Sequence, residues 1–325
     1  MKKKFSFLLS ILLTVCLVCV PCYSLAGGQE DAGISVVVTV FPAYDFVRQI
    51  TGGNARITML LPPGAESHFF DPTARDIVTI RDCDVFVYIG GESEAWVERI
   101  LASVDTGNMR IFSMLDAVDL MEEEIVEGMQ VEEHDHDEDH DDHDEDHEHM
   151  EFDAHVWTSP INAMRIVSQL TEVLAEADPA NAGLFRSNAA AYLEELAALD
   201  AAFRNVVDNA VRTTFVFGDR FPFRYFAAEY GLTYYAAFPG CSTSTDPTPR
   251  TLVFLIDKVK AEEIPVVFHI ELSNERVADL ISEATGAQKL LLHSVHNVAK
   301  SDFDAGVTYI ELMLRNVDAL KEALW

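Results

Sequence analysis

The residues of this chain most suited to chemistry are its histidines, and six of the eleven lie in one acidic run. Residues 134–149 read HDHDEDHDDHDEDHEH, so every position is His, Asp or Glu. Imidazole binds zinc, copper and nickel, and the carboxylates raise the local concentration of cations but also favour protonated imidazole. We predict a divalent-metal collector rather than a plain solvated charge run; its histidines are His134, His136, His140, His143, His147 and His149.

The five other histidines are widely spaced. His68 follows a Pro-Pro-Gly turn, His155 lies just after the acidic run, and His293 directly follows an apolar strand. His296 can replace or join His293, whereas His269 lies inside a strand and is expected to be structural. Ligands of open α/β sheets bind beyond the carboxyl ends of strands. Histidines from both halves are therefore predicted to meet there and to hold tetrahedral zinc with an oxygen ligand. For each histidine alone, the alternative is a hydrogen-bonded structural role.

The elements that must position these histidines alternate between strand and helix in both halves of the chain. Near-continuous β-branched and apolar runs are typical of strands buried in parallel sheets. This alternation predicts an α/β fold with two lobes, each a parallel sheet flanked by helices, and a metal site in the cleft between them. The predicted strands lie at 34–40, 56–61, 85–89, 109–114, 213–217, 232–238, 264–270 and 288–292.

A long helical pattern separates the two halves. Asp178-Pro179 predicts its start, and no Pro or Gly occurs from Leu184 to Val211. Roughly 30 residues at about 1.5 Å each give a rod on the order of 45 Å, which would join the lobes rigidly; a surface helix of a single domain is the alternative. We predict an N-terminal lobe at 27–177 containing a disordered acidic loop at 121–150, a linking helix at 178–211 and a C-terminal lobe at 212–325.

Residues 1–26 are predicted to be a signal peptide, with three lysines, an apolar run and a small-x-small cleavage site ending at Ala26. The run is close to the lower limit of about 17 residues for a membrane span, so an uncleaved anchor is the alternative. Its cysteines leave lipid anchoring open. We expect the protein in the periplasm or on the outer face of the cytoplasmic membrane. Whether Cys83 and Cys241 pair there stays open.

The composition excludes some classes of protein. The chain has 325 residues, 49% of them hydrophobic, which is too many for a wholly disordered protein. It has 54 acidic and 23 basic residues and a formal net charge of -31. Nucleic acid would be repelled by this charge, whereas metal cations would be attracted.

Four segments together resemble a known family. They read VFPAYD at 40–45, PGAESHFFDPT at 63–73, FDAHVWTSP at 152–160 and RYFAAEYGL at 224–232. They resemble the zinc- and manganese-type solute-binding proteins of bacterial ABC transporters, which include zinc-uptake periplasmic binding proteins and metal-binding surface lipoproteins. The resemblance covers about residues 34–325, and the acidic run lies where zinc-type members carry a His-rich loop.

The resemblance implies two α/β lobes joined by a rigid helix, with metal between them. It implies a high-affinity receptor that delivers Zn2+ to a membrane permease driven by a separate ATPase. His68 and His155 carry over as metal ligands of the first lobe. We expect a monomer that binds Zn2+ in preference to Mn2+ and that binds no nucleic acid.

The second half departs from the family pattern. The family's third ligand is a His or Glu five residues before Tyr225, where this chain has Arg220. Asp219 is the nearest substitute, and the alternative is that Arg220 pairs with a carboxylate. The family's fourth ligand is an Asp just after a strand, where this chain has His293, a replacement that would favour zinc. Glu271 lies near another acidic position of the family and is a candidate to support a ligand.

The function expected from these features is capture, not catalysis. The sequence contains no His-Glu-x-x-His motif and no nucleophile elbow, so we do not expect an enzyme. Asp153 is expected to fix the tautomer of His155. The alternatives are a surface adhesin, a zinc hydrolase, and an extracellular metal buffer in which only the acidic run matters.

Overall fold

The computed structural model describes residues 33–66, 70–130, 152–242 and 246–325. The predicted signal peptide, His68 and the acidic run with its six histidines lie outside these residues. Residues 33–325 form one compact unit, which contains two four-stranded sheets. The α/β class with two parallel sheets is therefore confirmed.

The first sheet has the strand order β2-β1-β3-β4, and all its neighbouring strands are parallel. Alternate residues of its central strand face opposite sides: Val36 and Val38 join the main core, whereas Val37 packs with a smaller cluster against α2 and α3. The elements of this lobe are β1 Ser35–Val38, α1 Phe41–Thr51, β2 Arg56–Met59, α2 Ala74–Arg81, β3 Val85–Tyr88, η2 Glu92–Glu94, α3 Ala95–Ser103, β4 Arg110–Ser113 and η3 Leu115–Ala117.

The second sheet repeats this topology with the order β6-β5-β7-β8, again all parallel. Helices α7 and α8 pack against one face of it. Corresponding strands, and the loops that follow them, are therefore arranged in the same order in the two lobes. The elements of the second lobe are β5 Thr214–Phe221, α6 Arg224–Tyr230, β6 Thr233–Pro239, α7 Pro249–Ala261, β7 Val266–His269, α8 Arg276–Thr285, β8 Gln288–Leu291, α9 Lys300–Ala305 and α10 Tyr309–Leu324.

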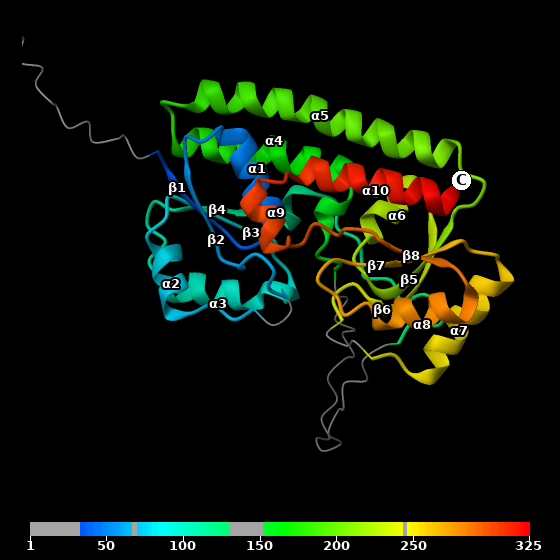
Figure 1. Ribbon diagram of the computed structural model, residues 1–325. Coiled ribbons are helices and arrows are strands. Elements are labelled where there is room, and N and C mark those ends of the chain that lie inside the picture. Colours follow the sequence, from blue (N-terminus) through cyan, green and yellow to red (C-terminus); the bar gives the residue numbers. More distant parts are fainter. Residues whose placement is uncertain (1–32, 67–69, 131–151, 243–245) are drawn as a thin grey trace, which may run out of the picture. The chain divides into compact units, whose positions relative to one another are not determined.

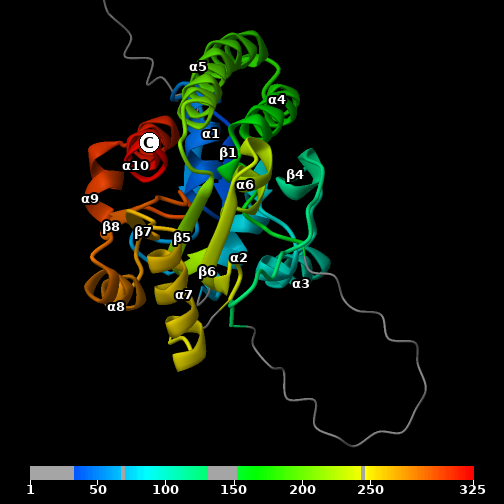
Figure 2. The ribbon, with the colours of Figure 1, turned by 90° about the vertical axis from the view of Figure 1, so that its right-hand side faces the viewer.

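Between the sheets in sequence lie the short helix η4 Val156–Thr158 and the helices α4 Pro160–Ala177 and α5 Ala182–Asp208. In Figures 1 and 2, α5 runs over both sheets, with α4 and α10 beside it. The helix begins at Ala182 rather than at Asp178, because Asp178 ends α4 and its carboxylate accepts the Asn181 N–H in an intervening turn.

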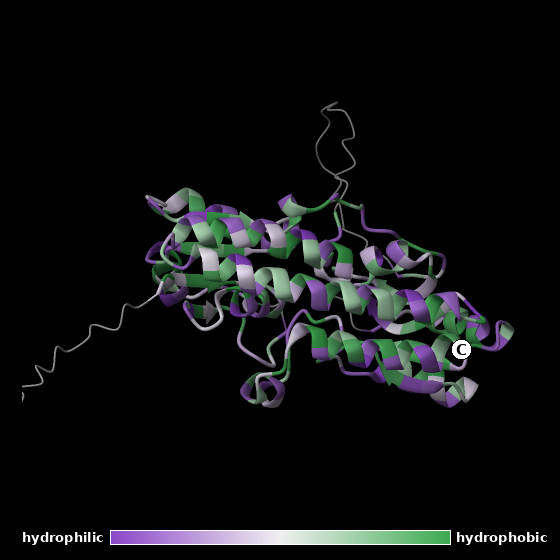
Figure 3. Cartoon of the chain, turned by 90° about the horizontal axis from the view of Figure 1, so that it is seen from above, coloured by the Kyte–Doolittle hydropathy of each residue, from purple (hydrophilic) through white to green (hydrophobic). Residues whose placement is uncertain are grey.

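One continuous apolar core connects the two sheets through these helices. It contains β1 and β3 of the first sheet, β5 and β7 of the second, and the inner faces of α1, α4, α5, α6 and α10. Figure 3, from above, shows hydrophilic and hydrophobic residues alternating along these helices, as expected for helices with one buried face. Within the described ranges, no helix is long and apolar enough to span a bilayer.

Candidate metal-binding site

Two small hollows adjoin at the carboxyl ends of the strands, and His155 and His296 line both of them. The first hollow also contains Glu94 and Cys241, and its cavity volume is about 30 Å³. The second has a volume of about 20 Å³ and includes the charged residues Glu66, Arg220 and Glu271. Parallel α/β sheets place their ligands at this edge, so the histidine pair occupies the expected part of the fold.

His155 is buried and held by its own neighbour in sequence. The Asp153 carboxylate accepts the His155 backbone N–H at 2.7 Å, and the same oxygen lies 3.1 Å from Nδ1. A carboxylate only accepts, so Nδ1 carries the proton and the Nε2 lone pair is available to a metal. The expected contact between Asp153 and His155 is thus confirmed.

Glycine is required beside this pair because the backbone comes close. A side chain at Gly240 would place its first carbon 2.9 Å from the Phe221 carbonyl oxygen and 3.3 Å from His155 Nδ1. The turn after β6 can therefore cover the Asp153–His155 pair only without a side chain.

His296 comes from the loop after β8, and its ring meets that of His155. The ring centroids are 5.3 Å apart, and Trp157 lies against both rings. A zinc ion lies about 2.0–2.1 Å from each ligating nitrogen, so rings at this separation are close enough to share one ion. Within the described part of the chain, no group of three His, Cys, Asp or Glu side chains forms a ready-made metal site.

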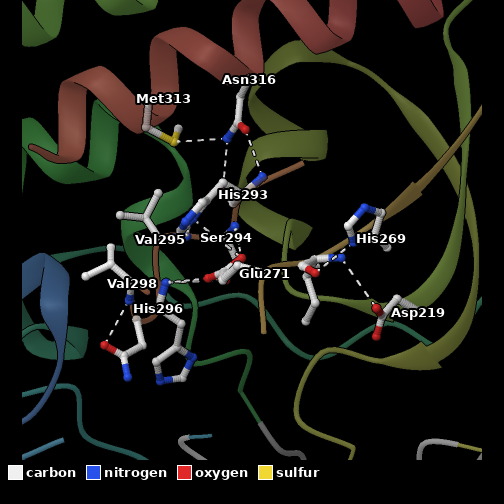
Figure 4. Close-up of polar contacts among 12 residues, drawn as sticks. Asp219, His269, Glu271, His293, Ser294, Val295, His296, Val298, Met313 and Asn316 are labelled. Atoms are coloured by element: carbon white, nitrogen blue, oxygen red, sulfur yellow. Dashed lines mark hydrogen bonds and ion pairs between the residues drawn. The ribbon is translucent and has the colours of Figure 1, made fainter. Parts of the chain in front are cut away.

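Glu271, two residues after the end of β7, holds the loop that presents His296 (Figure 4). Its carboxylate accepts the Ser294 N–H at 2.7 Å, the Ser294 hydroxyl at 2.6 Å and the His296 N–H at 3.1 Å. Its side chain is 8% exposed. The sequence suggested that Glu271 supports a ligand, and these contacts match that role; whether it also binds metal stays a prediction.

The structure brings His296, not His293, to His155. Among the described residues that line the two hollows, His293 does not appear. Its Nδ1 instead accepts the Val295 N–H at 3.0 Å, and Asn316 of α10 hydrogen-bonds to its backbone N–H and carbonyl. The expected exchange of the family's carboxylate for a histidine therefore fits His296 better than His293.

Arg220 pairs with a carboxylate, as one of the two alternatives for it predicted. It is buried at the end of β5, and its guanidinium donates to both carboxylate oxygens of Glu66 at 3.2 Å. Glu66 belongs to the loop that leads to His68. The pair joins the loop after β2 to the second sheet and neutralises the arginine charge next to the histidines.

Asp219, the proposed substitute ligand, lies elsewhere. It is not among the described residues lining either hollow, and its carboxylate accepts the Arg220 and Ile270 N–H groups. Burial raises its pKa. His269 is likewise structural in its contacts, with Nδ1 3.0 Å from the Ile270 carbonyl oxygen. No disulfide joins Cys83 and Cys241.

Sequence reasoning missed four residues around the histidine pair: Glu66, Glu94, Gly240 and Asn297. The Asn297 side-chain amide donates to the carbonyls of Pro62 and Ala65 at 2.8 and 2.9 Å. A signal existed for three of them, because Glu66, Gly240 and Asn297 each lie within two residues of a quoted motif, a strand end or a histidine. Glu94 lacked such a signal, since it is buried only once η2 brings its carboxylate to the Ile89 and Gly90 N–H groups.

Comparison with known proteins gives a consistent result. The family model for zinc-uptake complex component A, periplasmic, matches residues 36–323. The zinc-binding lipoprotein AdcA of Streptococcus pneumoniae is 32% identical over 320 residues, which is 98% of this chain but only 61% of that protein. The high-affinity zinc uptake system protein ZnuA of Bacillus subtilis is 33% identical over 303 residues, covering 93% of this chain and 91% of that protein.

Solved structures with the same fold include two from these organisms. The Zn(II)-bound ZnuA-like domain of Streptococcus pneumoniae AdcA has a TM-score of 0.73 and 28% identity, over 90% of this chain and 99% of that domain. The metal-dependent lipoprotein YcdH of Bacillus subtilis has a TM-score of 0.73 and 29% identity, over 90% of this chain and 99% of that chain.

Proposed function

Because this chain belongs to the periplasmic zinc-uptake component A family, which matches residues 36–323, we propose that it captures Zn2+ and delivers it to an ABC permease. The observation that carries the proposal is the pairing of His155 and His296 at the strand ends, with ring centroids 5.3 Å apart. Histidine nitrogens in a partly enclosed polar hollow suit zinc as cargo.

The nitrogen ligands in this proposal are His68, His155 and His296. His68 is retained from its motif, since it lies outside the described residues. His296 takes the place first considered for His293, because Nδ1 of His293 accepts a backbone N–H instead. Asp219 is left out because its carboxylate holds backbone N–H groups of the second lobe.

The acidic histidine run is proposed to collect metal for this site. The run itself is outside the described residues, but the segments on either side of it are anchored close to His155. Glu122 pairs with Phe152 as an antiparallel bridge, and the Asp153 N–H donates to the Met121 carbonyl at 3.0 Å. The chain therefore returns from the run only three residues before His155.

We further propose that the protein works outside the cytoplasm, as a monomer and not as an enzyme. The export signal predicted at residues 1–26 supports this location, and AdcA of Streptococcus pneumoniae is described as a zinc-binding lipoprotein. One continuous core contains residues of both sheets, so a single chain supplies both histidines of the site, which supports a monomer.

The test is zinc titration of the purified mature chain with residues 131–151 deleted. We expect one tightly bound zinc per chain, and its loss in His155→Ala and in His296→Ala. Deletion of the run removes six histidines that would otherwise bind zinc themselves. If no tightly bound zinc remains after the deletion, the protein is a metal buffer in which only the acidic run binds zinc, and the proposed receptor function is wrong.

A matched control is His269→Ala. His269 is also a buried histidine at a strand end of the second lobe, but its Nδ1 faces the Ile270 carbonyl oxygen. Zinc stoichiometry and affinity should be unchanged in this variant. Circular dichroism of every variant checks that a loss of binding is not a loss of fold.

A further inference from the structure

The residue before His296 has an unusual backbone conformation. Val295 is fully buried and has φ +62°. The left-handed region places the Cβ of an L-residue too close to the backbone, and the clash is worst for β-branched residues. Of the four described non-glycine residues with positive φ, which are Glu263, Leu272, Glu275 and Val295, only Val295 is β-branched. Such a conformation persists only where its surroundings hold it.

The contact that holds Val295 comes from His293. The Val295 N–H donates to His293 Nδ1 at 3.0 Å, and the Glu271 carboxylate lies 3.5 Å from the same nitrogen. In the contact with Val295, Nδ1 is the hydrogen-bond acceptor. The His293 backbone is fixed in turn by Asn316, which accepts its N–H and donates to its carbonyl, both at 2.8 Å. The imidazole thus closes a short turn over two residues, in the way that an Asn side chain closes an Asx turn.

The same turn sets the direction of His296. Beyond Val295, the His296 N–H reaches Glu271 and the His296 carbonyl accepts the Phe41 N–H at 3.3 Å. The His296 ring then lies against Trp157 and His155. Trp157 also donates its indole N–H to the Ser294 carbonyl at 2.8 Å. An extended Val295 would send His296 away from all these partners.

We propose that His293 is a positioning residue, whose imidazole holds Val295 in the left-handed conformation that directs His296 towards the bound zinc. This inference rests on the zinc site proposed above and deepens it. It opposes the alternative that His293 itself binds the metal, since its Nδ1 accepts a backbone N–H and His293 is not among the described residues that line the two hollows.

The test combines substitutions in the chain lacking residues 131–151 and measures zinc affinity by competition with a chelator. His293→Ala should weaken zinc binding by about tenfold or more, as loss of groups that orient a ligand does. His293→Asn should retain most of the affinity, because an Asn oxygen can accept the Val295 N–H although it is a poor zinc ligand.

The decisive variant is the double substitution His293→Ala with Val295→Gly. Glycine adopts positive φ without a side-chain clash, so this variant should regain much of the lost affinity. Glu263→Gly in the His293→Ala background is the matched control, because Glu263 also has positive φ but is exposed at the end of α7. It should regain none.

The outcomes separate this inference from the proposed function. If His293→Asn binds as weakly as His293→Ala and Val295→Gly restores nothing, His293 is a ligand and the positioning role is wrong. If His155→Ala and His296→Ala also bind zinc normally, the proposed zinc site itself is wrong. Thermal unfolding of each variant excludes a general loss of structure, since rescue at Val295 must appear in affinity and not only in stability.

Discussion

The two lobes have the same strand order but use the glutamate after the third strand differently. In the first lobe, Glu94 accepts the N–H groups of Ile89 and Gly90, at 2.6 and 3.2 Å, and so closes its own loop. In the second lobe, Glu271 accepts three hydrogen bonds from Ser294 and His296, which belong to the loop after the next strand. Two glutamates that follow corresponding strands thus differ in role: Glu94 stabilises its own loop, and Glu271 orients a histidine on another loop.

The same strand order therefore does not give the two glutamates the same role. Their roles depend on which N–H groups each carboxylate accepts. Burial raises the pKa of Glu94 to about 7 despite its backbone hydrogen bonds. Ionisation of the buried Glu94 carboxyl therefore lowers the stability of the fold. Both glutamates line a hollow together with His155 and His296, but of the two only Glu271 accepts the His296 N–H, so its removal should affect metal binding as well.

The largest expected effect is therefore that of Glu271→Ala. It leaves both Ser294 donors without their acceptor and the His296 N–H with only its 3.3 Å contact to the Ser294 hydroxyl oxygen, and hydrogen bonds to charged groups contribute about 1.5–3 kcal/mol each. Zinc affinity should fall by about 10–100-fold, measured by chelator competition, with a clear loss of stability in urea unfolding. Equal zinc affinity in Glu271→Ala and Glu94→Gln would remove the distinction between the two glutamates.

The next effect concerns pH and belongs to Glu94. Its folded-state pKa of about 7 lies above the ordinary glutamate value of 4.5, so the folded protein binds the extra proton. Its contribution is fully present below about pH 4.5 and is lost as pH rises through about 7, a change of about 3 kcal/mol.

Glu94→Gln isolates this contribution, because the Gln carbonyl can still accept both N–H groups but does not ionise. Urea unfolding of the metal-free protein at pH 5 and pH 8 should show a larger loss of stability in the unaltered protein than in the variant. Parallel pH curves for the two proteins would mean that Glu94 is solvated when charged.

A smaller effect is expected for Asp153→Asn, the third carboxylate beside the histidines. Asn can still accept from His155 Nδ1 but lacks the charge that supports the metal-bound imidazole. Zinc affinity should fall by about tenfold, with little change in thermal unfolding. An unchanged affinity would show that Asp153 only shapes the backbone, through its 2.7 Å contact with the His155 N–H.

The smallest effect is expected for Asn297→Ala, which loses the two hydrogen bonds donated to Pro62 and Ala65 and the one accepted from the Val298 N–H. These should contribute about 1 kcal/mol each at most to stability, measured by urea unfolding. Because Glu271 still holds the His296 N–H in this variant, zinc affinity should fall much less than in Glu271→Ala. If zinc affinity fell as much in Asn297→Ala as in Glu271→Ala, Asn297 and not Glu271 would be the residue that positions His296.

Much of the fold could be predicted because its signals are local. The strands at 35–38, 85–88 and 266–269 lie inside the apolar runs that predicted them, since a strand buried on both faces must be apolar throughout. The start of α5 was placed wrongly because an Asp-Pro pair can end one helix as well as begin another, and here the Asp178 N–H is bonded back to Leu174 of α4.

For the site, the sequence by itself predicted the metal-binding chemistry and determined the Asp153–His155 pair, because that contact spans only two residues. Tertiary structure alone decided that His296 meets His155 while His293 turns to its own backbone. Both histidines follow the same strand, three residues apart, and the sequence around them does not distinguish their roles. The groups that do, Asn316, Glu271 and Trp157, lie 23 to 137 residues away along the chain, and only folding brings their hydrogen bonds to this turn.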